Sequence, residues 1–467
     1  MTIRFGTDGW RAVIGEDFTP ENVAIVAQAF ADVYATLPEN GKPVVIGYDR
    51  RNKSKESAEL IASVLLGNLI TVWLTEDYCP TPCVSWTVKN KGASAGIMVT
   101  ASHNPPKWNG IKFKESYGGA AAKEYLAPIE AKIEENIRVG RQAKTATLAG
   151  NNFHTFDPHQ DYVAALRKLI DLEKIKEANF KILYDAMYGS GSGFLNDFLG
   201  SQIVPLHDKA DPNFGGIHPE PIQPYVNEAM EKMRTGKYSV CLITDGDADR
   251  IGAVDEKGNY VSSHQIFSLL LKHLVENRGM SGKVLKSIST TVMLDRLCQK
   301  YGLSLGVTPI GFKAISPAMK EPGVLIAGEE SGGIGMPHHI CERDGLYCGL
   351  LLLELMTVKK KMLGDLIADL QKEVGPCYYK RVDLAIPQEK IEKLKLALAN
   401  FKPTEIAGKK LKKLTLIDGY HFALEDDSWL LIRPSGTEPL LRTYAEAPTL
   451  VQAENLLKEA QKLIDTL

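Results

Sequence analysis

The feature that most constrains this 467-residue sequence is a repeated alternation between short apolar runs and longer amphipathic stretches. Helical stretches of about 10–15 residues separate most of the apolar runs, and residues 19–37 open with a Thr-Pro-Glu capping signal. This alternation predicts α/β layers with largely parallel sheets. The runs that read as strands are 44–48, 97–99, 182–184, 240–243 and 324–327.

The end of the chain has a different pattern. Residues 377–386 and 414–432 are predicted strands, and 449–467 is a predicted amphipathic helix that begins with a Thr449/Gln452 capping box. These elements indicate a small α+β domain. The length exceeds what one hydrophobic core supports and predicts about three domains, with four possible.

The composition excludes several classes of function. Lysines and arginines number 55 against 57 acidic residues, so the net charge is −2 and no broad basic field attracts nucleic acid or an anionic membrane. The most apolar stretch, Leu346–Met356, is too short to span a bilayer and carries Glu354. Seven scattered cysteines form no disulfide framework, and Cys79 and Cys83 have no second pair at zinc spacing. With an N-terminus that lacks a signal-peptide core, these features predict a cytoplasmic protein with reduced thiols.

The segment Thr100–Lys112, TASHNPPKWNGIK, joins an apolar strand to a loop rich in turn formers. The turn presents Ser102 at the end of the strand, with His103, Lys107 and Lys112 close in sequence. A serine is a poor nucleophile unless a base or a cation assists it. The segment is therefore either a nucleophile loop or a polar turn whose side chains bond only their own backbone.

A second loop, TDGDADR at 244–250, follows the apolar strand VCLI. Asp245, Asp247 and Asp249 alternate along it, and they would repel one another unless a cation neutralised them. An EF-hand is one competing interpretation, since Glu256 falls at its twelfth position, but an arginine stands where that loop requires glycine. A solvated acidic turn is the other, although apolar residues flank the loop on both sides. We predict a Mg²⁺ site with coordination left open for a phosphate oxygen.

Two further loops follow apolar strands. GEESGG at Gly328–Gly333 places Glu329 and Ser331 among glycines, which suits hydrogen bonding to sugar hydroxyls. A hydrolytic carboxylate pair is the alternative, but Glu329 and Glu330 are adjacent and should point to opposite sides of an extended segment. RPSGTEP at Arg433–Pro439 offers a guanidinium, two hydroxyls and backbone N–H groups. These groups suit a phosphate dianion, the alternative being a surface turn with a solvated arginine.

Residues 182–208 imitate a dinucleotide-binding unit, with a strand, a glycine-rich turn, a helix, a second strand and then Asp208. The third glycine of that fingerprint is replaced by Phe194, where close packing of the helix requires a small residue. We therefore set an NAD-dependent oxidoreductase aside.

Together the four loops resemble those of a known family. TASHNP, DGDADR, GEESGG and RPSGTEP, in this order across the whole chain, are similar to the signature loops of the α-D-phosphohexomutase superfamily, phosphoglucomutase/phosphomannomutase type. FGTDGWRA, HPEPI, TPIGFK and ERDG also resemble family segments. The GEESGG loop resembles the phosphoglucomutase branch more than the phosphomannomutase or phosphoglucosamine mutase branches. Ala12, Cys341 and Arg343 depart from the commonest patterns without removing a charge that the mechanism needs.

The resemblance implies roles for individual residues. Ser102 is similar to the family's phosphoserine, which shares a metal ion with Asp245, Asp247 and Asp249. The resemblance implies catalytic or acid–base roles for His103 and Lys112, and it implies that Arg11 and Arg250 stabilise the transferring phosphoryl group. The implied ligands of the sugar are Thr308, Glu329, Ser331 and Arg343. The implied ligands of the distal phosphate are Arg433, Ser435, Gly436 and Thr437.

The resemblance also implies an architecture, a reaction and partners. Three α/β domains with mixed, largely parallel sheets and a C-terminal α+β domain would surround a central cleft, with limits at 1–150, 151–256, 257–374 and 375–467. The implied reaction interconverts hexose 1-phosphate and hexose 6-phosphate, with glucose favoured, using one Mg²⁺ and glucose 1,6-bisphosphate as activator. Mannose or dual specificity is the alternative, and a Mg²⁺-dependent phosphatase and a non-catalytic sugar-phosphate sensor are more remote. We expect hexose phosphates as partners, no nucleic acid or membrane, and a monomer or weak homodimer.

Overall fold

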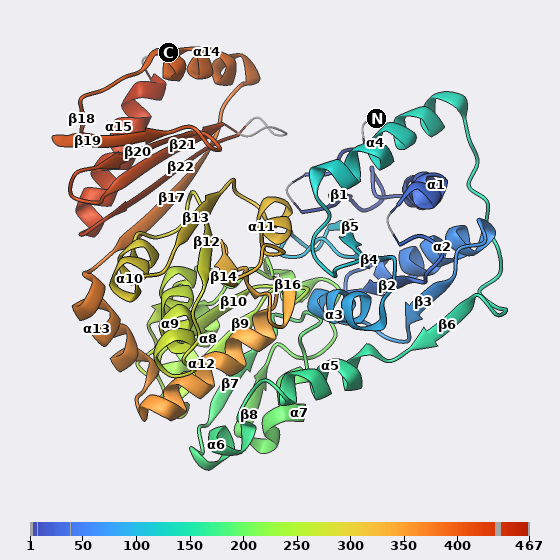
Figure 1. Ribbon diagram of the computed structural model, residues 1–467, viewed down its shortest axis with the longest axis horizontal. Coiled ribbons are helices and arrows are strands. Elements are labelled where there is room, and N and C mark those ends of the chain that lie inside the picture. The colour runs from blue at the N-terminus through green and yellow to red at the C-terminus, as the bar shows by residue number, and fades with distance from the viewer. Residues whose placement is uncertain (1–2, 7, 38, 435–439, 466–467) are drawn as a thin grey trace.

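The computed structural model describes residues 3–6, 8–37, 39–434 and 440–465. Four β-sheets follow one another along the chain, each with its own helices (Figure 1). The first three sheets mix parallel and antiparallel strands, whereas the fourth is antiparallel throughout. This arrangement confirms the predicted fold class of three α/β units and a C-terminal α+β unit.

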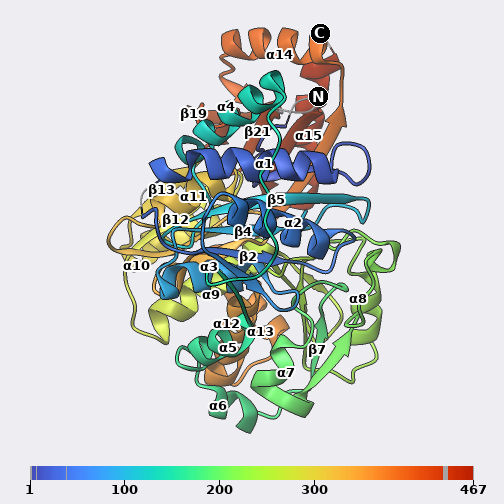
Figure 2. The ribbon, with the colours of Figure 1, turned by 90° about the vertical axis from the view of Figure 1, so that its right-hand side faces the viewer.

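The first sheet has the strand order β1-β5-β4-β2-β3-β6. Strands β4, β2, β3 and β6 are parallel to one another. At one edge, β5 pairs antiparallel with β4, and β1 pairs antiparallel with β5. Helix α1 begins after Thr19, whose side chain accepts a hydrogen bond from Asn22 N, and it packs against both α2 and α4 (Figure 2). The bounds are β1 (Trp10–Val13), α1 (Pro20–Val33), η1 (Tyr34–Thr36), β2 (Val44–Tyr48), α2 (Ser54–Gly67), β3 (Val72–Thr75), α3 (Thr81–Lys91), β4 (Ala95–Val99), β5 (Trp108–Glu115), α4 (Lys123–Val139) and β6 (Phe153–Phe156).

The second sheet has the order β11-β10-β9-β7-β8, and β8, β7 and β9 are parallel. Strand β10 returns antiparallel beside β9, so the loop between them lies where the strand direction reverses. The bounds are α5 (Pro158–Arg167), α6 (Leu172–Glu177), β7 (Ile182–Asp185), α7 (Phe194–Leu199), η2 (Gly200–Gln202), β8 (Ile203–Leu206), η3 (Phe214–Gly216), α8 (Asn227–Met233), β9 (Val240–Thr244), β10 (Ile251–Val254) and β11 (Tyr260–Val261).

The third sheet repeats this plan in the order β13-β12-β14-β15-β16, with β13, β12 and β14 parallel and β15 returning antiparallel beside β14. Helix α12 is buried along most of its length, and it packs against elements of both the second and the third sheet. The bounds are α9 (Ser263–Glu276), β12 (Lys283–Ser287), α10 (Met293–Tyr301), β13 (Leu305–Thr308), α11 (Phe312–Ala318), β14 (Val324–Gly328), β15 (Ile334–Met336), β16 (Ile340–Arg343), α12 (Gly345–Lys359) and α13 (Leu363–Val374).

The fourth sheet, β17-β22-β21-β20-β19-β18, lies at one end of the molecule, far from the first sheet in Figure 1. A small apolar cluster that includes Trp429 and Tyr444 of this sheet and Ile288 of the third-sheet unit joins it to the rest. The bounds are β17 (Tyr378–Ala385), α14 (Gln388–Asn400), β18 (Glu405–Ile406), β19 (Lys409–Thr415), β20 (Tyr420–Leu424), β21 (Trp429–Pro434), β22 (Leu440–Ala447) and α15 (Leu450–Asp465).

Polar contacts dock the first sheet onto the third. Lys114 of β5 bonds Glu342 of β16 at 2.6 Å, and both side chains are fully buried. Lys313 donates to the Gly6 carbonyl at 3.0 Å. Within the described residues, no helix is both long enough and apolar enough to cross a bilayer. The predicted domain limits stay predictions, although pairing of β6 with β3 carries the first sheet to residue 156.

Candidate active site

The predicted nucleophile lies in a tightly held turn. Ser102 follows β4, is fully buried and has φ +53°, a left-handed conformation that costs a non-glycine residue about 1–3 kcal/mol. The guanidinium of Arg51 holds this turn, because it donates to the carbonyls of Ser102, Asn104 (2.6 Å), Pro105 (3.0 Å) and Trp108 (3.2 Å). The strained conformation is therefore fixed by a buried cation from another part of the first sheet unit.

Three carboxylates meet this serine. Asp245, Asp247 and Asp249 follow β9, all three are fully buried, and each offers an oxygen within 4.8 Å of the other two. The Ser102 hydroxyl donates to Asp245 Oδ2 at 2.9 Å. The structure thus brings together two predicted loops that lie 143 residues apart.

A metal ion fits this donor set. Asp247 Oδ1 and Asp249 Oδ1 are buried and have no hydrogen-bond partner among the described residues. Burial raises the pKa of Asp245 well above its ordinary value, and the neighbouring Asp247 and Asp249 raise it further. Clustered hard oxygens with unused lone pairs suit Mg²⁺, which would neutralise the mutual repulsion of the carboxylates. Asp245, Asp247 and Asp249 could therefore hold the ion beside Ser102 Oγ.

Glycines let a second loop support the aspartates. Ser190 N donates to the Gly246 carbonyl at 3.0 Å, and a Cβ atom on Gly189 would lie only 2.7 Å from that oxygen. The glycine-rich turn that imitated a dinucleotide site therefore packs against the acidic loop. This contact gives the glycines a structural reason unrelated to a dinucleotide.

Lys112 is a buried cation among three carboxylates. Its ammonium lies 2.8 Å from Asp247 Oδ2, 2.9 Å from Asp249 Oδ2 and 2.8 Å from Asp8 Oδ2. Burial by itself would lower the pKa of Lys112, but the three carboxylates outweigh it and raise that pKa. Lys112 is therefore a fixed positive charge at the aspartates.

Arg343 connects the acidic loop to the sugar-loop candidate. Its guanidinium lies 2.6 Å from Asp8 Oδ2, 2.7 Å from Asp249 Oδ2 and 3.3 Å from Glu329 Oε1. The neighbouring Glu330 instead accepts from Ser289 Oγ at 2.6 Å, and it lies in a turn and not in the extended segment that the sequence analysis expected. Burial raises the pKa of Glu329 despite the opposing charge of Arg343.

Two arginines and a histidine complete this network. Arg11 of β1 donates to Asn104 Oδ1 at 2.7 Å, and Arg250 donates to Glu220 Oε1 at 3.2 Å. His103 Nε2 lies 4.0 Å from the same Glu220 oxygen. Burial lowers the pKa of His103 well below its ordinary value, and nearby cations, Arg250 first among them, lower it further. His103 is therefore neutral near pH 7.

The remaining predicted residues lie toward the fourth sheet or outside the description. Arg433 of β21 donates from Nε to Asp418 Oδ1 at 3.0 Å, and Asp418 Oδ2 accepts from Ile310 N at 3.0 Å. Asp418 thereby ties Arg433 to the loop that begins at Thr308. Ser331 is half-buried with its hydroxyl oxygen enclosed. Ser435, Gly436 and Thr437 lie outside the described residues.

Sequence reasoning missed four residues that touch this network. Asp8 and Glu220 lie in FGTDGWRA and HPEPI, which resemble family segments but gave no individual role. Thr81 donates to Asp247 Oδ2 at 2.5 Å, and Arg51 holds the serine turn. Burial distinguishes Arg51 from a surface arginine, but the sequence YDRRN gives no sign that this side chain is buried.

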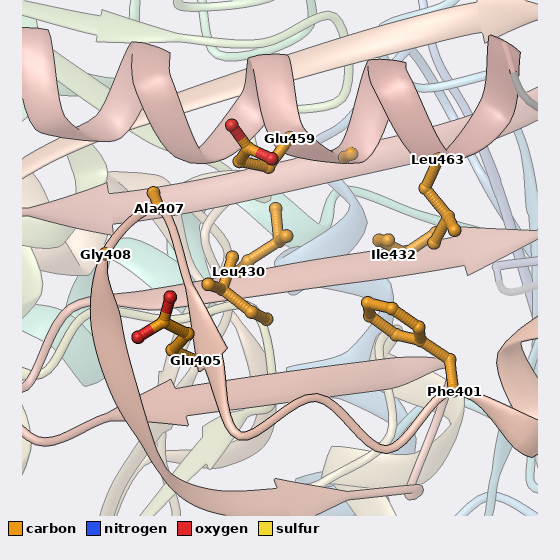
Figure 3. A pocket seen from close by; sticks show the side chains of 10 residues that line it. Phe401, Glu405, Ala407, Gly408, Leu430, Ile432, Glu459 and Leu463 are labelled. Carbon is orange, nitrogen blue, oxygen red and sulfur yellow. The ribbon is translucent and has the colours of Figure 1, made fainter.

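A separate hollow lies in the fourth-sheet unit (Figure 3). It has a volume of about 260 Å³, an apolar floor that includes Leu430 and Ile432 of β21, and Glu405 and Glu459 on its walls. None of the predicted site residues that the structure describes lines it. We therefore place the candidate active site at Ser102 and not in this hollow.

Comparison with known proteins agrees with this geometry. Models of the four phosphoglucomutase/phosphomannomutase domains match the chain in order: α/β/α domains I, II and III match residues 2–139, 160–258 and 262–374, and the C-terminal domain matches 388–463. A Pyrococcus abyssi protein described as a probable phosphoglucosamine mutase is 32% identical, with 98% of this chain and 97% of that protein covered.

Two further relatives span the whole chain. A Thermococcus kodakarensis phosphoglucomutase/phosphomannomutase is 29% identical over 99% of this chain and 98% of its own length. A Thermus thermophilus crystal structure, provisionally described as a phosphomannomutase, superposes with a TM-score of 0.87 at 31% identity, covering 100% of this chain and 99% of that one. The chain belongs to the phosphoglucomutase/phosphomannomutase family and is an enzyme of the α-D-phosphohexomutase superfamily.

Proposed function

We propose that this mutase interconverts hexose 1-phosphate and hexose 6-phosphate, with glucose as the favoured hexose, through a phosphoserine at Ser102. One observation carries the proposal: the Ser102 hydroxyl lies 2.9 Å from Asp245 within a buried carboxylate trio that has unused oxygens. A hydroxyl beside a divalent-cation site is the arrangement that phosphoryl transfer requires.

The proposed reaction has two transfers. In the first, the P–Oγ bond of phosphorylated Ser102 breaks and a P–O bond forms to the free hydroxyl of the hexose phosphate, which gives the 1,6-bisphosphate. The hydroxyl proton leaves through a base at the site. After the bisphosphate turns around, its other phosphoryl group returns to Ser102 Oγ, and the departing sugar oxygen regains a proton. Glucose 1,6-bisphosphate would activate the enzyme by phosphorylating free Ser102.

Different residues would stabilise charge and transfer protons. A bound Mg²⁺ would stabilise the charge on the transferring phosphoryl oxygens. Arg11 and Arg250 would add cationic hydrogen-bond donors there. Lys112, held by three carboxylates, suits charge stabilisation, whereas the neutral His103 suits proton transfer, because its Nδ1 has no partner among the described residues.

The two ends of the substrate need different contacts. Glu329 and Ser331, with Thr308 and Arg343, would bind sugar hydroxyls, and these contacts must tolerate the sugar in both orientations. Arg433, together with Ser435, Gly436 and Thr437, would hold the phosphate that is not being transferred. In support, Asp418 connects Arg433 to the segment that follows Thr308.

The sugar is the finer part of the proposal. The GEESGG loop favours the phosphoglucomutase branch, but relatives carry the names phosphoglucosamine mutase, phosphoglucomutase/phosphomannomutase and phosphopentomutase. Mannose or dual glucose/mannose specificity is the second candidate, because glucose and mannose differ only at C2. The seven unpaired cysteines support a reducing, cytoplasmic location, and we propose a monomer or weak homodimer.

The test compares kcat/KM for glucose 1-phosphate, mannose 1-phosphate and glucosamine 1-phosphate, with glucose 1,6-bisphosphate and Mg²⁺ supplied. We expect isomerised sugar phosphate with little inorganic phosphate, and the highest kcat/KM for glucose 1-phosphate. Steady release of inorganic phosphate would identify a phosphatase instead. Intact mass spectrometry distinguishes the mutase from a non-catalytic sensor, because a sensor would lack the phosphorylated species, which is heavier by about 80 Da.

A further inference from the structure

Asp8 has a buried carboxylate, and one of its oxygens contacts three cationic side chains. Its Oδ2 lies 2.6 Å from the Arg343 guanidinium, 2.8 Å from the Lys112 ammonium and 3.4 Å from the Arg11 guanidinium. The side chain is only 8% exposed. Burial raises the pKa of Asp8, but Arg343, Lys112 and Lys114 outweigh it and hold that pKa well below the ordinary value. Asp8 is therefore ionised at neutral pH, between the first and third sheets.

Two of these cations, Lys112 and Arg343, also pair with the carboxylates of the proposed metal site. Lys112 lies within 2.9 Å of Asp247 and Asp249, and Arg343 lies 2.7 Å from Asp249. A divalent cation drawn to the trio competes with Lys112 and Arg343 for these carboxylates. As the ion binds, both side chains lose part of the attraction that holds them at the aspartates.

Asp8 is the carboxylate that remains available to both. Glu329 and Glu342 also pair with Arg343, but neither has an ion pair with Lys112 among the described residues. Asp8 contacts Lys112 and Arg343 together and is not a member of the trio. It can therefore hold the two cations when the aspartates are occupied by a metal ion.

We propose that Asp8 is a positioning residue that anchors Lys112 and Arg343 and thereby frees Asp247 and Asp249 for the metal ion. This inference rests on the proposed metal-dependent function. It predicts that Asp8 strengthens metal binding through Lys112, since a cation with no other anchor would stay on the aspartates and compete with the ion.

The first measurement is calorimetric titration of Mn²⁺ into the full-length enzyme and its Asp8→Asn variant without substrate. We expect the Kd to rise about 10–100-fold in Asp8→Asn, the size of a charge-assisted hydrogen bond. A Kd within about threefold of wild type would overturn the inference. Failure of the wild-type enzyme to bind Mn²⁺ would instead contradict the metal site of the proposed function.

A double-mutant cycle separates positioning from simple loss of negative charge. In a Lys112→Met background, the competing ammonium is absent, so Asp8→Asn should change the Kd by less than about threefold. An equal rise in both backgrounds would mean that Asp8 acts only through its charge and would overturn the inference. Glu354→Gln is the control for loss of a buried carboxylate, because Glu354 pairs with His273 and Arg278, neither of which pairs with the aspartate trio among the described residues. The Kd of this control should stay within about threefold of wild type.

Asp8→Glu keeps the proposal testable if the Asn variant does not fold. It preserves the charge, so the Mn²⁺ Kd should stay within about threefold of wild type. The extra methylene group displaces the two cations, and kcat should fall at least about tenfold with little change in KM, because misplacement by about 1 Å costs up to about 100-fold. A wild-type kcat would show that the anchor has no positioning role.

Discussion

Replacing Lys114 by methionine tests how the first and third sheets are held together. Lys114 Nζ lies 2.6 Å from Glu342 Oε2, and both side chains are 0% exposed. Glu342 Oε1 also accepts from Arg343 N at 3.0 Å. Methionine fills a similar volume without charge, so Lys114→Met leaves the carboxylate of Glu342 buried without its closest partner and with the guanidinium of Arg343, 3.4 Å from Oε1, as its remaining charged contact.

The cost follows from the loss of one partner of a buried ion pair. Such a loss costs about 3–5 kcal/mol. Because Arg343 stays 3.4 Å from Glu342 Oε1, we expect the lower end of this range, about 3 kcal/mol.

Hydrogen exchange of the β5 amides is the suitable assay, because a chain with several domains need not unfold in two states. Relative to wild type at pH 7, exchange in Lys114→Met should be about 150-fold faster. Lys132→Met removes an exposed pair with Glu135 on α4 and should change exchange by less than about fivefold. An acceleration no larger than that of Lys132→Met would refute the reasoning.

Three shorter predictions concern the site and the core. Ser102→Ala should abolish turnover and the phosphorylated species in intact mass spectra while the circular dichroism spectrum stays unchanged; near-normal turnover would remove the nucleophile assignment. Arg433→Ala should chiefly raise KM in steady-state kinetics, since it loosens the distal phosphate, and an unaltered KM would argue against that role. Burial raises the pKa of Glu354, but hydrogen bonds from His273 and Arg278 outweigh it and lower that pKa from 4.5 to about 2. The ionised form therefore adds stability above about pH 4.5 that is lost as the pH falls toward 2. Glu354→Gln should flatten this acid limb in unfolding curves, and parallel curves for the two proteins would contradict it.

Local patterns predicted the strands and the loops that follow them. The run 44–48 is β2, and the run 324–327 lies within β14. Both predictions depend on an apolar run bounded by turn formers, which is a property of neighbouring residues. The expectation for Glu329 and Glu330 assumed extended backbone, but Glu330 lies in the turn that follows β14.

The residues that sequence reasoning missed depend on long-range packing. Arg51 acts through four carbonyls that lie more than 50 residues away, and Asp8 acts through Arg343, which is 335 residues away. Neither the segment around Arg51 nor that around Asp8 has a local pattern that distinguishes such a contact from a solvated surface charge. Packing within the first sheet unit reveals the role of Arg51, and docking of the first and third sheets reveals that of Asp8.

The three α/β sheets share a plan that accounts for the site's charge balance. In each, a parallel strand ends in a functional loop and an antiparallel strand returns beside it: β4 to β5, β9 to β10, and β14 to β15. Several buried charges at this site are paired across sheet boundaries. Lys112 of the first sheet is paired with Asp247 and Asp249 of the second, and Arg343 of the third is paired with Asp8 of the first. Because buried charges are stable only when paired, docking of the sheets and assembly of the active site are one event, and a variant that loosens the docking should also weaken metal binding.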